Sequence, residues 1–220
     1  MNSNFPFINI HTHKISDTDV SILNVSDIVF LNPHQQYVSI GLHPWTINKV
    51  GADKTLELIR ERSKDKNVVA IGECGLDKLI DVDFHLQEKL FREQISIAEK
   101  VQKPIIIHCV KAFDDLIRIK KEMKIAVPLI VHGYNNNIQI ANELIKNGFY
   151  ISLGNALLNM ESNASKVIST IPVEHLFLET DDSDFTIKEL YESADKHLRM
   201  DIELLKQLVY KNYIKIFIHE

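Results

Sequence analysis

The sequence has little cysteine, no long apolar run and no basic N-terminal region followed by an apolar one. Its only two cysteines are Cys74 and Cys109. Without a visible secretory signal, we expect both to be free thiols in a reducing compartment. No apolar segment reaches the roughly 18 residues that a membrane helix needs. These absences argue against a secreted protein and a membrane protein, and they favour a cytoplasmic enzyme.

The chain also lacks an excess of basic residues, because its formal net charge is −5. A general nucleic-acid coat or scaffold protein is normally basic, since neutralisation of phosphates drives that kind of binding. An anionic substrate of this chain must therefore be held locally, by metal ions or by a few basic side chains.

No low-complexity tract, fixed-period repeat or Gly/Ser/Pro-rich linker interrupts the 220 residues, of which 45% are hydrophobic and 25% charged. This composition is that of an ordinary globular protein, and the length suits one domain with a substantial core. We therefore expect residues 1–220 to form a single domain.

Short apolar, β-branched runs alternate with longer helical patterns along the chain. The expected strands are Phe7–His11, Ser21–Val25, Val38–Leu42, Val68–Gly72, Ile105–His108, Leu129–His132, Tyr150–Leu153 and Leu176–Thr180. The expected helices are Asp53–Lys64, Asp83–Gln102, Ala112–Lys124, Ile138–Asn147, Ser162–Ser169 and a helical tail after Thr186. Helix Asp83–Gln102 has an aspartate at its start, apolar residues at helical spacing and Pro104 just beyond its end.

Eight apolar strands that alternate with helices predict an α/β fold, a (β/α) barrel of TIM type. Only about 30 residues separate His13 from His43, which is too few for two full β/α units. We therefore expect a barrel that is shortened or distorted near its N-terminal β/α units. The alternative is an open doubly wound sheet, but no Gly-rich phosphate loop follows the first expected strand.

Polar side chains follow the expected strands at the ends where barrel enzymes place their active sites. His11 and His13 share one face of the first strand, since side chains alternate along a strand. The full set is His11, His13, Glu73, His108, His132 and Asp181. One such histidine alone is more often a satisfied core residue, but six groups together suit two divalent ions. The central carboxylate, Glu73, is the best candidate for a ligand that bridges both ions.

These motifs resemble the TatD-type metal-dependent hydrolases, also described as TatD DNases, of the amidohydrolase-like barrel superfamily. The similarity covers nearly the whole chain, including the helix positions Gln87, Phe91, Gln94 and Ala98. The matching stretches are His11-Thr12-His13, Gly41-Leu42-His43-Pro44, Ala70-Ile71-Gly72-Glu73-Cys74-Gly75-Leu76-Asp77, Pro104-Ile105-Ile106-Ile107-His108, Val131-His132-Gly133-Tyr134, Glu179-Thr180-Asp181 and the tail Asn212-Tyr213-Ile214-Lys215-Ile216-Phe217.

The resemblance implies a ligand set and a reaction. His11, His13 and Asp181 would hold one ion, Glu73 would bridge, and His108 with His132 would hold the second. Asp181 would orient a metal-bound water and accept its proton, and relatives in this way hydrolyse phosphodiester bonds of DNA from an end. The donor set leaves the metal open between zinc, manganese, magnesium, cobalt and nickel.

Residues around the expected ions depart from the family pattern. Val110 stands where the family usually has an arginine, and Lys111 could supply charge there without a bidentate contact. The Arg-Asn-Glu-Pro segment beyond the last strand has no counterpart, and Asp181 is followed by Asp182-Ser183 instead of a small residue and a proline. The hydrolytic core is therefore expected intact while the substrate-binding walls have changed.

Three further polar residues have expected roles near these ligands. His43 is expected either to contact substrate or to pack on Trp45. We expect Glu179 to orient a neighbouring ligand, and Asp77 to make a structural hydrogen bond in a tight turn.

The leading hypothesis is a two-metal deoxyribonuclease of 3′-to-5′ exonuclease type. Its catalytic residues would be Asp181 and Glu73, and its substrate-binding residues His43 and Lys111. The alternatives are hydrolysis of a small phosphoester, lactone or cyclic amide, and metal binding without turnover. The expected partners are DNA or a small phosphoester, with no membrane, and a monomer is favoured.

Overall fold

The computed structural model describes residues 5–25, 28, 36–48 and 51–218. Its contacts divide the chain into two compact units. The terminal unit consists of Met1–Leu23 and Val131–Glu220, and the middle unit consists of Asn24–Ile130. The expectation of a single domain over residues 1–220 stays a prediction.

Each of the eight expected strands has a counterpart, and the strand order in the sheet is β1-β2-β3-β4-β5-β6-β7-β8. The pairs β1–β2, β3–β4, β4–β5 and β7–β8 are parallel. The strands are β1 Ile8–Thr12, β2 Val20–Val25, β3 Val38–Ile40, β4 Val68–Asp77, β5 Ile105–Val110, β6 Leu129–Val131, β7 Phe149–Leu153 and β8 Leu176–Leu178. Strand β4 differs most from expectation, because it continues five residues beyond Gly72, as far as Asp77.

The helices also fall where the sequence places them. They are α1 Ala52–Arg62, α2 Phe84–Val101, α3 Phe113–Met123, α4 Ile138–Lys146, α5 Asn163–Val167, α6 Ile187–Leu198 and α7 Ile202–Tyr213, followed by a π-helical turn at Ile214–Ile218. Helix α2 begins at Asp83, whose side chain accepts a hydrogen bond from the Leu86 N–H group. It ends at Gln102 in the left-handed conformation, two residues before Pro104, so the end signals act as expected.

The first connection of the barrel lacks a helix. Residues 13–19, between β1 and β2, form bends and coil. In the part of the chain that the structure describes, the first α-helix begins only at Ala52. Most of the connection from β2 to β3 lies outside the described residues. The shortening expected at the N-terminal β/α units is thus confirmed for the first of them.

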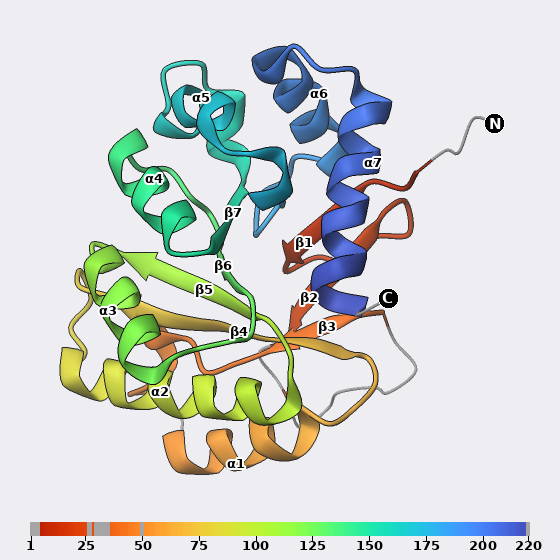
Figure 1. The fold of residues 1–220 in the computed structure, drawn as a ribbon. Helices are drawn as coiled ribbons and strands as arrows, with labels where there is room; N and C mark the ends of the chain where they lie inside the picture. Colours follow the sequence, from red (N-terminus) through yellow and green to blue (C-terminus); the bar gives the residue numbers. More distant parts are fainter. Residues whose placement is uncertain (1–4, 26–27, 29–35, 49–50, 219–220) are drawn as a thin grey trace. The chain divides into compact units, whose positions relative to one another are not determined.

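In the middle unit, α2 lies along β4 and α1 lies beside α2 (Figure 1). Two buried glutamines of α2 hold the strand ends. The amide of Gln94 accepts from the Leu42 N–H group at 2.7 Å and donates to the Leu42 carbonyl at 3.2 Å. Gln87 makes the same pair of bonds to Asp77, at 2.8 and 3.0 Å. Helix α2 therefore fixes the main chain where β3 and β4 deliver their polar side chains.

In the terminal unit, α7 packs against β1 (Figure 1) and also contacts β8. The buried Tyr191 hydroxyl of α6 lies 3.2 Å from both the N–H and the carbonyl group of Ile8. Asn212 of α7 donates to the Leu176 carbonyl at 3.1 Å. These contacts fix the start of β1 and β8. Among the described residues, no helix is both long and apolar enough to cross a bilayer.

Candidate metal centre

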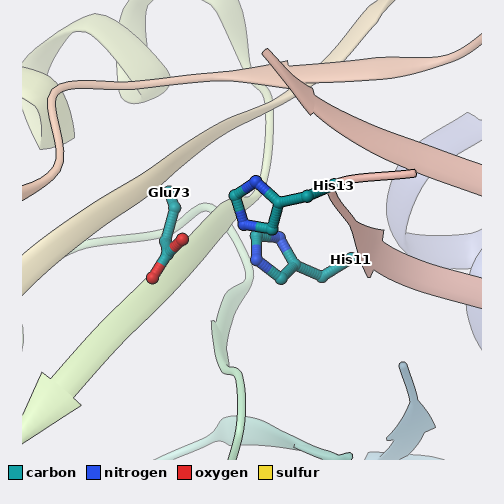
Figure 2. A group of neighbouring side chains, drawn as sticks. All are labelled: His11, His13 and Glu73. Atoms are coloured by element: carbon teal, nitrogen blue, oxygen red, sulfur yellow. The ribbon is translucent and has the colours of Figure 1, made fainter. Parts of the chain in front are cut away.

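The terminal unit brings His11, His132 and Asp181 together, with one potential ligand atom of each within 4.8 Å of the others. His11 and His13 both project from the end of β1 (Figure 2). The Nε2 atoms of His11 and His13 each lie 3.4 Å from the same Asp181 oxygen, Oδ1. The rings of His11 and His132 are 4.4 Å apart, centroid to centroid. Three imidazoles thus surround one carboxylate. We call His11, His13, His132 and Asp181 the terminal cluster.

The main chain fixes the Asp181 side chain in the terminal cluster. The Asp181 N–H group donates to the His11 carbonyl at 3.0 Å, and the His13 N–H group donates to the Asp181 carbonyl at 3.1 Å. These two bonds form a parallel bridge between Thr12 and Asp181. Asp181 itself has φ 51°, a left-handed conformation that a non-glycine residue adopts at a cost of order 1 kcal/mol. The strand ends therefore set where the carboxylate lies.

Glu179 orients His132. Its buried carboxylate oxygen Oε1 lies 3.2 Å from His132 Nδ1 and accepts from the Gly133 N–H group at 2.5 Å. A proton on Nδ1 would be donated to this carboxylate, which leaves Nε2 of His132 as the nitrogen for a metal ion.

The middle unit forms a second group from His43, Glu73 and His108, again with ligand atoms within 4.8 Å of one another. Glu73 extends from β4 (Figure 2), and its carboxylate is only 7% exposed. One oxygen, Oε1, lies 2.9 Å from His43 Nε2 and 3.0 Å from His108 Nδ1. The Glu73 N–H group donates to Asn24 Oδ1 at 3.0 Å. We call this group the middle cluster.

Trp45 and Asp77 border the middle cluster. The indole N–H of Trp45 donates to Asp77 Oδ2 at 2.8 Å, and that oxygen lies 3.4 Å from His108 Nε2. Asp77 is the last residue of β4, so its expected position in a tight turn was wrong, although it does accept structural hydrogen bonds. Glu73, Gly75 and Asp77 share a strand face once β4 continues past Gly72, but pairing with β5 is what keeps this segment extended.

His43 packs on Trp45, which is one of its two expected roles. Its ring packs on Trp45 with centroids 5.0 Å apart, and its Nε2 faces Glu73. Lys111 follows β5 in the left-handed conformation, with an exposed side chain. A role in substrate binding stays a prediction for both residues.

Each unit brings its own histidines together with a carboxylate. His132 lies with His11 and Asp181, whereas His108 lies with His43 and Glu73. The family resemblance implies that His108 and His132, which belong to different units, hold one ion together, and this pairing stays a prediction. The assignment of ligands to two ions, with Glu73 as the bridge, stays a prediction.

The electrostatic setting keeps Asp181 and Asp77 charged. Burial raises the pKa of Asp181, but hydrogen bonds with His11 and His13 outweigh it and hold that pKa well below its usual range. Burial likewise raises the pKa of Asp77, and the stronger opposing effect of Trp45 and the Leu79 N–H group lowers it overall. Both side chains are therefore anionic at neutral pH, which is the form that binds cations.

The cysteines behave in the opposite way. Burial raises the pKa of the Cys74 thiol far above its usual range and that of Cys109 to about 12. Both stay protonated at neutral pH, and a protonated thiol is a poor metal ligand. Both are also free, as expected. The ligands available near Glu73 and His108 are thus imidazoles and carboxylates.

Comparison with known proteins identifies the class. The family described as TatD related DNase matches residues 8–218. The uncharacterised metal-dependent hydrolase YabD of Bacillus subtilis is 34% identical over 188 residues, 82% of this chain and 73% of YabD. The uncharacterised metal-dependent hydrolase YjjV of Escherichia coli is 30% identical over 155 residues, 69% of this chain and 60% of YjjV.

Among solved structures, the TatD homologue YjjV of Escherichia coli K12 superposes with a TM-score of 0.84 at 23% identity, covering 96% of this chain and 97% of YjjV. This similarity confirms the TIM-type barrel and leaves no support for the open doubly wound sheet. The fold and the two clusters define a metal-dependent hydrolase. The chain belongs to the TatD-related DNase family.

The residues present fit divalent metal ions. Imidazole nitrogens and carboxylate oxygens are the donor types that zinc, manganese, cobalt and nickel accept, and both clusters supply them within a distance that one ion can span. The expected dependence on divalent metal is therefore supported by both the relatives and the donor sets.

Proposed function

We propose that this chain hydrolyses phosphodiester bonds of DNA from a 3′ end, with two divalent ions as cofactors. The observation that carries this proposal is the presence, in each unit, of a compact group of imidazoles around one carboxylate at strand ends. The description of the family as TatD-related DNases supports the choice of DNA.

In this mechanism the ligands are His11, His13, His132 and Asp181 in the terminal cluster, and Glu73 and His108 in the middle cluster. Two divalent ions held by these residues would supply a water of lowered pKa and positive charge against the phosphoryl group. Asp181 accepts the proton of the attacking water, since its carboxylate is anionic and, at 45% exposed, open to solvent.

His43 and Lys111 would contact the substrate. His43 Nδ1 accepts a hydrogen bond from the Trp45 N–H group at 3.1 Å, so in the neutral ring the proton is on Nε2. That N–H is a donor that a phosphate oxygen could take in place of Glu73. The exposed ammonium of Lys111 adds local positive charge on a chain whose net charge is −5. We further propose that the protein works as a monomer in the cytoplasm.

A second candidate is a hydrolase of small phosphoesters. It is favoured by the changed surroundings of the cluster residues, where Val110 and Asp182-Ser183 replace groups that the family uses near its substrate. Such a chain would still bind the ions but would bind a DNA strand weakly.

The test is metal analysis and turnover on one preparation. Metal content is measured by mass spectrometry, and a 5′-labelled single-stranded oligonucleotide is followed on a sequencing gel with added Mg²⁺ or Mn²⁺. About two ions per chain and a ladder of products shortened from the 3′ end are expected, with loss on chelation and recovery on refilling. Two ions without a ladder, but with turnover of a small phosphodiester, would favour the second candidate. No bound metal under any condition would overturn both.

A further inference from the structure

We propose that Asp77 is a positioning residue for His108 and that Trp45 holds Asp77 in place, so that Nδ1 of His108 is the nitrogen that faces a metal ion. This inference rests on the proposed role of His108 as a metal ligand.

The starting point is that both ring nitrogens of His108 face a carboxylate. Nδ1 lies 3.0 Å from Glu73 Oε1, and Nε2 lies 3.4 Å from Asp77 Oδ2. A neutral imidazole offers a lone pair on one nitrogen and carries a proton on the other. One carboxylate therefore belongs on the proton side of the ring and the other on the metal side.

Asp77 has the properties of the proton-side partner. Its Oδ2 accepts the Trp45 indole N–H at 2.8 Å, and its Oδ1 accepts the Leu79 N–H group at 2.8 Å. The side chain is only 4% exposed, and Gln87 holds both main-chain polar groups of the same residue. Such a carboxylate cannot swing toward an ion, but Oδ2 keeps a lone pair for the His108 Nε2–H group.

Glu73 has the properties of the metal-side partner. Its Oε1 lies 3.0 Å from His108 Nδ1 and accepts from the Nε2–H group of His43, so Glu73 and His108 are the members of this group that keep lone pairs for an ion. Asp77 is not part of that group. With the proton of His108 on Nε2, its Nδ1 lone pair points to the side where Glu73 lies.

Trp45 connects the two sides. Its main-chain N–H group donates to His43 Nδ1 and its indole N–H donates to Asp77. The ring centroids of His43 and His108 lie 5.0 and 5.5 Å from that of Trp45. Yet the residue is 55% exposed, so burial in a core does not explain its position. One tryptophan thus sets the hydrogen bonding of both imidazoles of the middle cluster.

The test compares D77N and W45F with the wild type and with D81N, a control at an exposed aspartate of the same connection. In D77N the side-chain amide can turn a donor toward His108 Nε2, which would favour the wrong tautomer. W45F keeps an aromatic ring but removes the indole N–H, and its exposed position makes loss of the fold a minor concern. Circular dichroism checks folding of each variant.

Two readouts do not depend on turnover. The first is the ¹⁵N spectrum of labelled histidine, with and without Zn²⁺, in which the His108 signals are assigned by comparison with H108Q. We expect Nε2–H and a Zn²⁺-bound Nδ1 in the wild type and in D81N. The second is Zn²⁺ affinity by calorimetry. We expect a loss of about 10- to 100-fold for one of the sites in D77N, a smaller loss in W45F and none in D81N.

Wild-type His108 with its proton on Nδ1, or folded D77N and W45F with wild-type Zn²⁺ affinity, would overturn the inference alone. Wild-type protein that binds no metal would overturn it together with the proposed function. A third result is that the wild type binds metal, and D77N and W45F lose Zn²⁺ affinity as expected, while no variant cleaves DNA. That result would leave this inference standing and reject only the choice of substrate.

Discussion

The terminal and middle clusters use similar donors but hold them by different means. In the terminal cluster, main-chain hydrogen bonds between His11, His13 and Asp181 place the carboxylate, and Asp181 stays 45% exposed. In the middle cluster, the Glu73 carboxylate is 7% exposed, and the side chains of Asn24, Trp45 and Asp77 arrange its surroundings.

This difference separates two tasks. A carboxylate fixed by strand pairing and open to solvent can meet water and substrate without moving, which suits proton transfer. A buried carboxylate surrounded by side-chain donors suits ion binding, because those donors tune the orientation and basicity of the ligands. Substitutions of the surrounding side chains Trp45 and Asp77 should therefore alter metal affinity through the middle cluster.

The largest expected effect is on proton transfer in the terminal cluster. Asp181→Asn keeps the size and main-chain bonds but removes the base, so we expect turnover to fall about 1,000-fold while much of the metal is retained. Initial rates and metal content measure this. D114N, at an exposed aspartate of α3, is the control. A fully active D181N variant would show that another group takes the proton.

The next largest effect is expected from a substitution in the main chain of β4 beside the middle cluster. Gly75 has φ 149°, and a Cβ there would collide with the His108 carbonyl oxygen. We expect Gly75→Ala to lower the free energy of unfolding by about 3 kcal/mol or more. Gly51→Ala, where a Cβ meets nothing closer than 3.9 Å, should cost less than about 1 kcal/mol. Equal losses in urea unfolding would contradict this account.

A smaller effect should come from the support of the middle cluster by α2. Gln94→Leu removes both partners of the Leu42 main chain, next to His43, so we expect a loss of about 1–3 kcal/mol. Gln94→Glu in its protonated form keeps an acceptor for the Leu42 N–H group and a donor for the Leu42 carbonyl, so at about pH 4 it should cost less. At that pH, hydrogen exchange at the Leu42 amide should speed up more in Q94L than in Q94E. If the two variants exchange alike, the amide bond is not what holds this segment.

The smallest effect lies outside both clusters. Hydrogen bonds from Arg118 and, less strongly, Arg92 lower the pKa of Glu88 from 4.5 to about 2. Because the folded pKa is below the unfolded one, this pairing stabilises the protein above about pH 4.5 and is lost as the pH falls toward 2.

Glu88→Gln should therefore lower stability by about 1 kcal/mol or less at pH 7, and the difference from wild type should vanish near pH 2. Urea unfolding across this pH range measures it, with E57Q as the control at an exposed glutamate of α1. A difference that persists at pH 2 would point to packing instead of charge. Metal affinity should be unchanged in both variants.

The sequence predicted the elements well where local signals agree. Apolar runs located all eight strands, and Asp83 with Pro104 bounded α2. The C-terminal end of β4 was harder to predict, because Gly72 and Gly75 are residues typical of a turn. Its pairing with β5, from Ile71–Ile105 to Asp77–Val110, keeps this segment extended. Only the neighbouring strand supplies that information.

The candidate site divides in the same way. The residues at strand ends could be predicted, because the C-terminal ends of parallel strands meet at one end of a barrel. The link from Trp45 to Asp77 joins residues that are 32 positions apart, and no periodicity indicates it. The grouping of His132 with Asp181 depends in the same way on contacts between strands.

The two glutamines of α2 have a mechanical consequence. Gln87 and Gln94 are seven residues apart in one helix, which corresponds to two turns and a rise of about 10.5 Å. Each binds both polar groups of one residue at a strand end, Asp77 or Leu42. The helix therefore fixes the spacing along its axis between these two main-chain segments of the middle unit. A shift of α2 along its axis would displace the main chain beside His43 and that of Asp77 together, in the same direction and by the same amount.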